Sequence, residues 1–207
     1  MSESLFQRLG RELDEMREQG VYKPHHVLDS PQDAVVRLQG HGEVINLCSN
    51  NYLGLCSVPE VVEAGKRAYD AYGAGTSSVR FICGTFSIHL ELEKRIASFL
   101  GTESALTYVS CWNANTGLMP TFLGEEDALI SDELNHASII DGVRMTKANR
   151  FVYAHSNMKE LEEALKAART HGHRFVISDG VFSMEGDLCK LPDLLELSRK
   201  YDAVLCL

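Results

Sequence analysis

The sequence predicts an α/β protein with a mostly parallel, doubly wound sheet. From residue 101 onward, short apolar runs typical of buried strands alternate with longer stretches of helical periodicity. Several of these runs end in a polar turn from which the next helix begins, as in repeated βα units with right-handed crossovers. The 207 residues suffice for one domain with a sizeable core.

The first hundred residues predict mainly helices and loops. Apolar residues recur at helical spacing over 3–19, which indicates an amphipathic helix. Short strands are expected at 34–38 and 44–48 within an irregular connector. Two more helices are expected from Val61 to Gly73 and from Ile88 to Gly101.

The regular alternation follows from there. Strands are expected near 104–109, 127–131, 150–153, 174–178 and 203–207, and helices near 113–123, 135–146, 157–170 and 192–200. Asn157 and Glu160 have the spacing of a capping box, and Pro192 stands where the first turn of a helix tolerates proline.

Composition excludes several classes of protein. The net charge of −9 and the lack of a Lys/Arg run argue against a nucleic-acid surface. No apolar stretch approaches membrane-spanning length, so we expect no membrane partner. The six cysteines are scattered without metal-ligand spacing, which predicts no metal site and reduced thiols. A cytoplasmic location is expected, and a mitochondrial one for a processed form is not excluded.

Two consecutive strand-to-helix turns carry the strongest chemical signals. Ser110, Cys111 and Trp112 follow an apolar run and open a helix, whose free amides and partial positive charge suit a phosphate. In the next unit His136 stands at a helix start and offers an imidazole. Ligands of open α/β sheets bind beyond the carboxyl ends of the strands, where both turns are expected. Each turn has a plainer interpretation, a simple βα turn for the first and a capping or surface histidine for the second.

Two polar residues in earlier loops are further candidates. Asn50 lies in a polar turn, where asparagines often serve only the turn geometry but are also able to bind a carboxylate. Arg80 is the only charge in the small-residue loop 73–85. It is either a solvated loop residue or a group that grips an anionic substrate. This loop lacks the third glycine of GxGxxG, so a dinucleotide fingerprint is rejected.

Four segments together resemble the α-oxoamine synthases: Asn50–Gly54, Ser78–Thr85, Asn135–Gly142 and Asp179–Gly186. The resemblance implies a pyridoxal-phosphate (PLP) enzyme of fold type I, the aspartate-aminotransferase fold, that condenses an amino acid with an acyl-CoA. Two of the segments are most similar to members that join glycine to acetyl-CoA, giving 2-amino-3-oxobutyrate and CoA in threonine breakdown. A sister synthase using another acyl-CoA and a non-catalytic relative acting as a binding subunit remain the alternatives.

The resemblance also implies roles for the candidate residues. Ser110, Cys111 and Trp112 would hold the PLP phosphate, mainly through backbone amides. His136 would stack on the pyridine ring, and Ser183 would donate a hydrogen bond to the phenolic oxygen; these two are the catalytic candidates. Asn50 and Arg80 would lie near the substrate. A homodimer with active sites at the interface is implied for the full-length protein.

The resemblance covers roughly the N-terminal half of a family member. The family's Schiff-base lysine and the aspartate that pairs with the pyridine nitrogen come later in its sequence. We therefore expect a truncated chain, inactive by itself, with an N-terminal helix and connector over 1–45. Residues 46–207 would then be an incomplete large PLP-binding domain.

Overall fold

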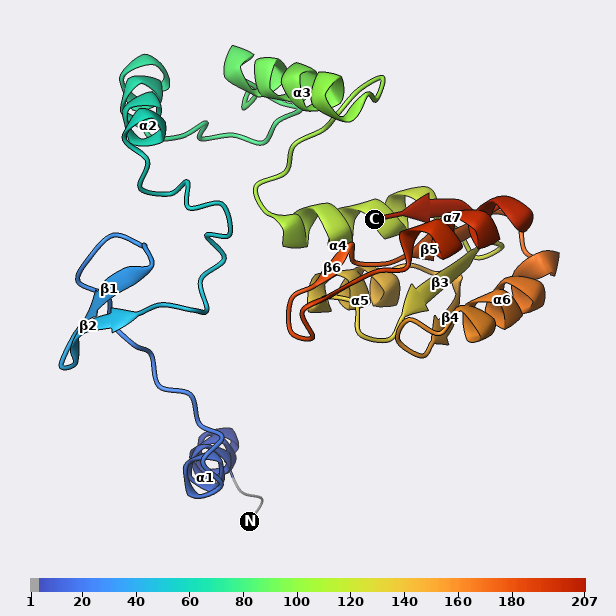
Figure 1. Ribbon diagram of the computed structural model, residues 1–207, viewed down its shortest axis with the longest axis horizontal. Coiled ribbons are helices and arrows are strands. Elements are labelled where there is room, and N and C mark those ends of the chain that lie inside the picture. The colour runs from blue at the N-terminus through green and yellow to red at the C-terminus, as the bar shows by residue number, and fades with distance from the viewer. Residues whose placement is uncertain (1–3) are drawn as a thin grey trace. The chain divides into compact units, whose positions relative to one another are not determined.

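A computed structural model describes residues 4–207 of the protein. The chain forms two compact units, Met1–Phe86 and Ser87–Leu207, and Figure 1 shows the elements of each. The predicted division into 1–45 and 46–207 stays a prediction. Among residues 4–207, no helix is both long and apolar enough to cross a membrane.

Over its described residues, 4–86, the first unit contains two helices and one small hairpin. Its elements are α1 (Leu5–Glu18), β1 (Val35–Leu38), β2 (Gly42–Ile45) and α2 (Pro59–Tyr72). Helix α1 begins at a capping box between Ser4 and Gln7, close to the predicted start at residue 3, which lies outside the described residues. Strands β1 and β2 pair antiparallel. Among the described residues, none in α1 or α2 is buried.

The second unit contains the predicted parallel sheet. Its helices are α3 (Ser87–Leu100), α4 (Cys111–Phe122), α5 (Ala137–Met145), α6 (Met158–Ala167) with a 3-10 turn to Thr170, and α7 (Leu191–Lys200). Its strands are β3 (Ala128–Asp132), β4 (Asn149–Tyr153), β5 (Arg174–Ile177), β6 (Val181–Phe182), β7 (Asp187–Leu188) and β8 (Val204–Cys206). Four of them form one sheet in the order β4-β3-β5-β8, with every neighbouring pair parallel. The fold class expected from the sequence is therefore confirmed.

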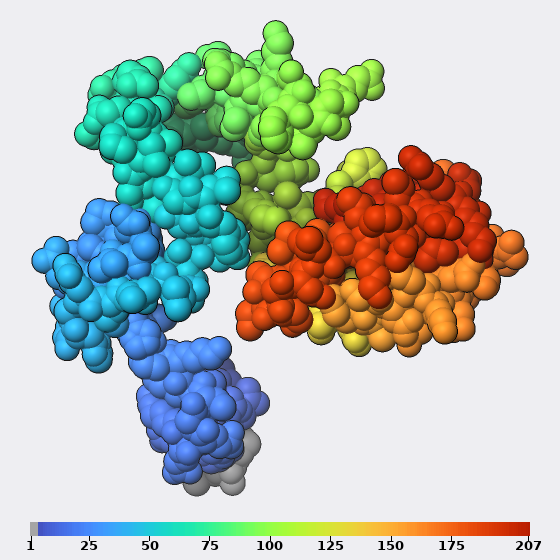
Figure 2. Space-filling view, viewed as in Figure 1, coloured from blue at the N-terminus to red at the C-terminus, as the bar shows by residue number. Residues whose placement is uncertain are grey.

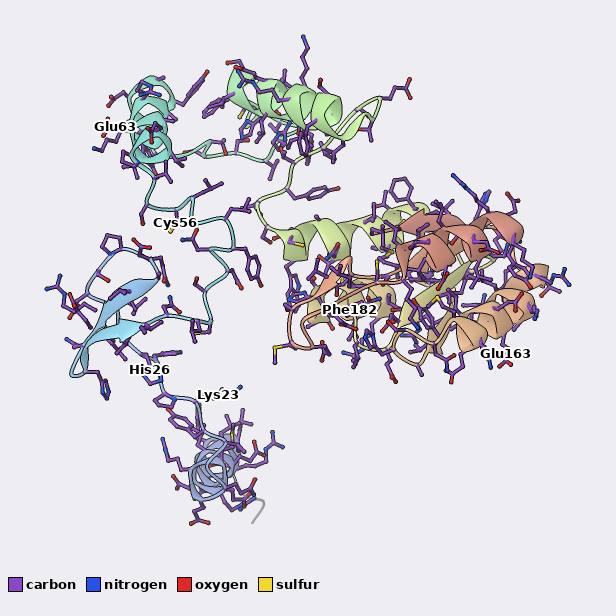
Figure 3. All side chains as sticks on the ribbon, viewed as in Figure 1. Lys23, His26, Cys56, Glu63, Glu163 and Phe182 are labelled. Carbon is purple, nitrogen blue, oxygen red and sulfur yellow. The ribbon has the colours of Figure 1, made fainter. Side chains whose placement is uncertain are left out.

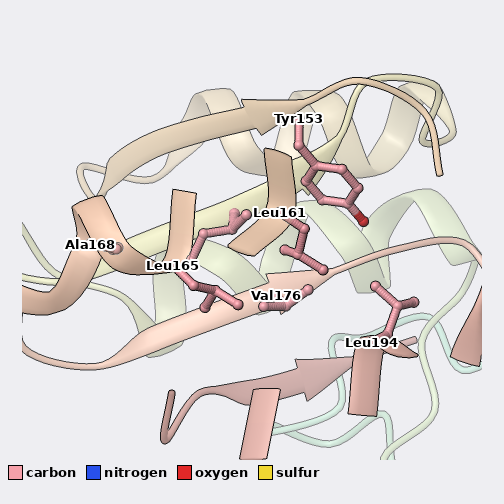
Figure 4. Packing of buried hydrophobic residues seen from close by; sticks show 8 residues of the cluster. Tyr153, Leu161, Leu165, Ala168, Val176 and Leu194 are labelled. Carbon is pink, nitrogen blue, oxygen red and sulfur yellow. The ribbon is translucent and has the colours of Figure 1, made fainter. Parts of the chain in front are cut away.

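Helices cover both faces of this sheet, and alternate residues of β3 supply the two cores. Ala128 and Ile130 pack with Leu161 of α6 and Leu194 of α7, a cluster drawn in Figure 4. Leu129 points the other way, into a cluster that holds residues of α4 and α5. The space-filling view in Figure 2 shows the α6 and α7 side of this unit in orange and red. All five residues of β3 are buried, as in a central strand.

The expected strand at 104–109 is wrong. None of the described strands pairs with this segment, although its sequence is apolar. This segment is held by a side chain and not by a neighbouring strand. The buried Glu93 carboxylate of α3 accepts hydrogen bonds from the Thr107 amide (2.8 Å) and the Thr107 hydroxyl (2.9 Å). Strand propensity needs a ladder partner to take effect, and Leu106 and Val109 remain exposed here.

The predicted helix starts at Asn157 and Pro192 are confirmed, although the capping box is incomplete because the Glu160 carboxylate accepts from the Ala154 amide instead of that of Asn157. The Asn157 side chain caps α6 by accepting a hydrogen bond from the Glu160 amide at 3.3 Å. Pro192 occupies the first turn of α7, where a missing amide costs nothing. Pro120 falls in the last turn of α4, which ends two residues later at Phe122.

Gly142 sets the distance between α4 and α5. A Cβ atom at this position would lie 2.5 Å from the backbone oxygen of Asn115, closer than any real contact. Only glycine therefore permits this spacing of the two helices. Ser110 and His136 are the N-caps of these two helices.

We expect Gly142→Ala to destabilise the full-length protein by about 1–3 kcal/mol, because backbone must move to admit the methyl group. Urea unfolding followed by circular dichroism measures this change. Gly117→Ala in α4 is the matched control: its Cβ would lie 3.6 Å from the Tyr108 ring, an ordinary contact. The control is expected to be neutral or up to about 1 kcal/mol stabilising through helix propensity. Equal effects of the two variants would contradict the close approach at Gly142.

Candidate active site

The polar residues of interest in the second unit gather at the carboxyl ends of β3 and β5. The chain leaves β3 at Asp132 and enters α5 at Ala137, and it leaves β5 at Ile177 and enters the β6–β7 hairpin at Val181. Figure 1 shows the hairpin beside the start of α5. This edge is where open α/β sheets bind their ligands.

The first turn of α4 has the geometry of an anion site. Ser110 is the N-cap, and its hydroxyl oxygen accepts a hydrogen bond from the Asn113 amide at 3.2 Å. The Ala114 amide donates to the Ser110 carbonyl at 3.1 Å. The amides of Cys111 and Trp112 precede these bonds and lie in the turn where a helix leaves its amides unpaired. The Cys111 and Trp112 side chains are exposed beside them.

His136 is the N-cap of α5. Its Nδ1 atom lies 3.2 Å from the Ser138 amide and 2.7 Å from the Ser138 hydroxyl. Its ring is exposed and meets the Trp112 ring edge to face, with centroids 6.3 Å apart and planes at 80°. The capping interpretation is thus confirmed, and the residue remains exposed beside Trp112.

One side chain joins the two helix starts. The amide nitrogen of Asn115 in α4 donates to the Ser138 hydroxyl at 2.9 Å, and Ser138 is fully buried. The Ser138 hydroxyl contacts His136 in turn. A continuous chain of contacts therefore fixes the imidazole relative to the first turn of α4.

Asp179 contacts the His136 backbone and is itself bound by Asn135, and sequence reasoning did not include these two among the site residues. The Asp179 carboxylate accepts a hydrogen bond of 2.6 Å from the His136 backbone amide. Asn135 is 3% exposed; its side chain donates to the Ile177 carbonyl at 3.0 Å and accepts from the Asp179 amide at 2.8 Å. Both residues lie in the loops that follow β3 and β5, and that position was the available signal.

Ser183 lies in the turn of the β6–β7 hairpin and is exposed. The hairpin closes through the Gly186 amide, which donates to the Phe182 carbonyl at 2.7 Å, with Gly186 at φ 78°. Phe182, labelled in Figure 3, is 2% exposed and anchors the strand directly before Ser183. The structure therefore positions Ser183 through its buried neighbour.

The two predicted substrate residues belong to the first unit. Asn50 is exposed, in a bend before the 51–58 turns. Arg80 is half-buried, and its Nε atom lies 3.2 Å from the Thr85 hydroxyl, which donates to the Arg80 carbonyl at 2.6 Å. The substrate-binding roles of Asn50 and Arg80 therefore stay predictions. Within residues 4–207, no group of His, Cys, Asp or Glu side chains is placed to hold a metal ion.

Comparison with known proteins adds relatives in sequence and structure. The chain is 48% identical over 207 residues to the 2-amino-3-ketobutyrate coenzyme A ligase of Escherichia coli K12, covering 99% of this chain and 52% of that protein. It is 48% identical over 198 residues to 8-amino-7-oxononanoate synthase 1 of Bacillus velezensis, covering 96% and 50%. The chain thus spans about half the length of the curated relatives it matches.

The fold of the chain is also similar to that of a solved protein structure. Serine palmitoyltransferase from S. paucimobilis, solved with a bound PLP–myriocin aldimine, superposes with a TM-score of 0.89 at 29% identity, covering 98% of this chain and 54% of that one. The family model for aminotransferases of class I and II matches residues 42–207, which include every site residue described above. The chain belongs to the class I and II aminotransferase family.

Proposed function

We propose that the protein is a PLP-dependent glycine C-acetyltransferase, which condenses glycine with acetyl-CoA to 2-amino-3-oxobutyrate and CoA. The junction of the α4 and α5 first turns carries this proposal, because it combines an anion site with an exposed aromatic nitrogen ring. The 48% identity to a 2-amino-3-ketobutyrate coenzyme A ligase supports the choice of substrates.

The residues of this junction fit PLP. A phosphate suits the first turn of α4, where the Cys111 and Trp112 amides lie at the positive end of the helix. The flat pyridine ring suits the exposed face of His136, which Asn115, Ser138 and Asp179 hold in place. When bound, PLP supplies an electron sink for the negative charge that develops on the glycine α-carbon.

The chain's own groups would then perform three tasks. The α4 first turn anchors the phosphate and fixes the register of the cofactor. His136 supports one face of the ring and keeps water from it. Ser183, on the anchored hairpin, holds its hydroxyl proton toward the phenolic oxygen of the cofactor. We propose that Asn50 and Arg80 bind the anionic groups of the substrates, a role that the family resemblance supports.

Comparing the rate of CoA release from different acyl-CoA donors tests the proposed function. We expect the full-length protein with PLP and glycine to release CoA from acetyl-CoA at least about tenfold faster than from succinyl-CoA or a long-chain acyl-CoA. The alternative is a synthase using another acyl-CoA, favoured by the 48% identity to an 8-amino-7-oxononanoate synthase. A preference for another donor would select that alternative, and no CoA release from any donor would favour a non-catalytic binding subunit.

We also propose a homodimer for the full-length protein. The amphipathic helix α1 supports this, because its apolar residues stay exposed, with Phe6 83% exposed and Leu5 56%. A second copy is the partner that the family resemblance implies. A fully active monomer in sedimentation measurements would contradict it.

A further inference from the structure

His155 lies between two carboxylates at the carboxyl edge of the sheet, apart from the residues discussed so far. Its Nδ1 atom is 3.0 Å from an Asp132 oxygen, and its Nε2 atom is 3.0 Å from an Asp187 oxygen. The His155 side chain is 18% exposed and that of Asp132 only 2%. Each ring nitrogen thus faces a negatively charged acceptor.

This geometry requires a doubly protonated ring. A carboxylate only accepts hydrogen bonds, so both ring nitrogens must carry a proton to satisfy both partners. A neutral imidazole has one N–H and would turn a lone pair toward the other carboxylate. Loss of the proton therefore breaks one of the two contacts and replaces it with repulsion.

The two carboxylates belong to different parts of the unit. Asp132 ends β3 and is held rigidly, because its carboxylate also accepts from the Leu134 amide (2.9 Å) and the Ser156 amide (3.0 Å). Asp187 begins β7, in the second strand of the hairpin. His155 thereby connects the sheet to the hairpin.

His155 also contacts the first strand of the hairpin. Its ring packs edge to face on the Phe182 ring, with centroids 4.4 Å apart. Phe182 and Asp187 are direct partners in the β6–β7 pairing. His155 therefore holds both strands next to the turn that contains Ser183, which follows Phe182 directly.

We propose that His155 is a positioning residue for Ser183, acting as a protonation-dependent clamp on the β6–β7 hairpin. The proposal rests on the proposed function in one respect, the role of Ser183 at the cofactor. The clamp itself requires only residues of this chain.

The charged groups around His155 agree with a clamp that needs the proton. Glu133 accepts a hydrogen bond from the His155 amide at 2.9 Å, which adds a third carboxylate. Cations also lie nearby: the Lys190 Nζ donates to the Ser156 carbonyl at 2.9 Å, and Arg144 and Arg150 line a pocket with Asp132 and Glu133. The hydrogen bond to Asp187 is the main cause that raises the pKa of His155; Asp132 adds to it and burial opposes it.

The stabilisation of the hairpin by His155 decreases as pH rises. A raised pKa in the folded state means that the stabilisation is complete below the unfolded value of about 6.5 and is lost as pH rises through the folded pKa. The hairpin is therefore clamped at pH values below the folded-state pKa of His155 and released above it.

Hydrogen exchange of the full-length protein without PLP tests the clamp. Mass spectrometry follows the peptides over 179–190 between about pH 6 and pH 9, with rates corrected for intrinsic base catalysis. We expect protection of the hairpin amides to fall with rising pH, because the neutral ring keeps a hydrogen bond to only one of the two carboxylates. His155→Asn should remove the pH dependence. Asp187→Asn should weaken it, because a carboxamide can donate to a neutral ring.

His173→Asn is the matched control, since His173 is an exposed histidine before β5, outside these contacts. It should keep the wild-type pH dependence. Equal pH dependence in wild type and His155→Asn would overturn the clamp, as would a pH-independent wild type. These results need no turnover, so a protein that failed to condense glycine with acetyl-CoA would leave them unchanged.

The link to Ser183 needs a second readout, the absorption spectrum of bound PLP titrated with pH. We expect His155→Asn to shift this titration in the same direction as Ser183→Ala, and His173→Asn to leave it in place. If His155→Asn changes hydrogen exchange of the hairpin but leaves the pH titration of the PLP spectrum unchanged, His155 does not position Ser183.

Discussion

Replacing His136 with alanine is expected to lower the PLP affinity of the full-length protein about 10–100-fold. The reason is the loss of the ring surface, worth about 1.5–3 kcal/mol for a stacked aromatic side chain. The condensation rate should fall as well, because the cofactor ring would lose its support. Fluorescence titration of PLP and CoA release from glycine and acetyl-CoA measure the two effects.

Two matched variants separate the ring from the cap, because His136 also caps α5 through Nδ1. Asparagine is a good N-cap without a ring, so His136→Asn should preserve stability and lose affinity as alanine does. His136→Phe should retain PLP, lose much of the condensation rate and cost about 1 kcal/mol of stability. Wild-type kinetics in the alanine and phenylalanine variants would leave His136 as a capping residue only.

Replacing Cys111 with proline is expected to weaken PLP binding about tenfold or more while leaving the fold intact. Proline removes the amide that would donate to the phosphate, a charge-assisted hydrogen bond worth about 1.5–3 kcal/mol. The first helical position tolerates proline, and Ser110 before it is extended, at φ −156° and ψ 161°, as a residue before proline prefers.

Cys111→Ala is the control for the thiol. It keeps the amide and should bind PLP like wild type if backbone groups hold the phosphate. The thermal midpoint should stay within a few degrees of wild type in both variants. Weak binding by the alanine variant and normal binding by the proline variant would instead assign the interaction to the thiol.

The parallel sheet could be predicted because strand and helix periods alternate clearly from residue 128 onward. The predicted strands β3, β4, β5 and β8 all pair within one sheet. The segment 104–109 has a similar pattern but no strand beside it among the described residues, and pattern alone does not reveal partners. Helix starts were predictable at Asn157 and Pro192, because capping depends on a few adjacent residues.

The candidate site was predictable in part for the same reason. Ser110 and His136 stand at helix starts, which are local signals. Asp179 contacts His136 across 43 positions, and His155 reaches Asp187 across 32, so no local pattern shows these contacts. In the sequence, His155 is merely a histidine between a strand and a helix.

The two-sided packing of β3 has a consequence for how this chain tolerates substitution. The sheet separates the interior of the second unit into two hydrophobic clusters. One contains Leu161, Leu165 and Leu194, and the other contains Met119, Ile139 and Val143. Only the second lies beneath the helices that begin at Ser110 and His136. Substitutions in the first cluster should change stability and spare the chemistry, and pairs taken across the sheet should add independently. The two layers are therefore free to vary at different rates.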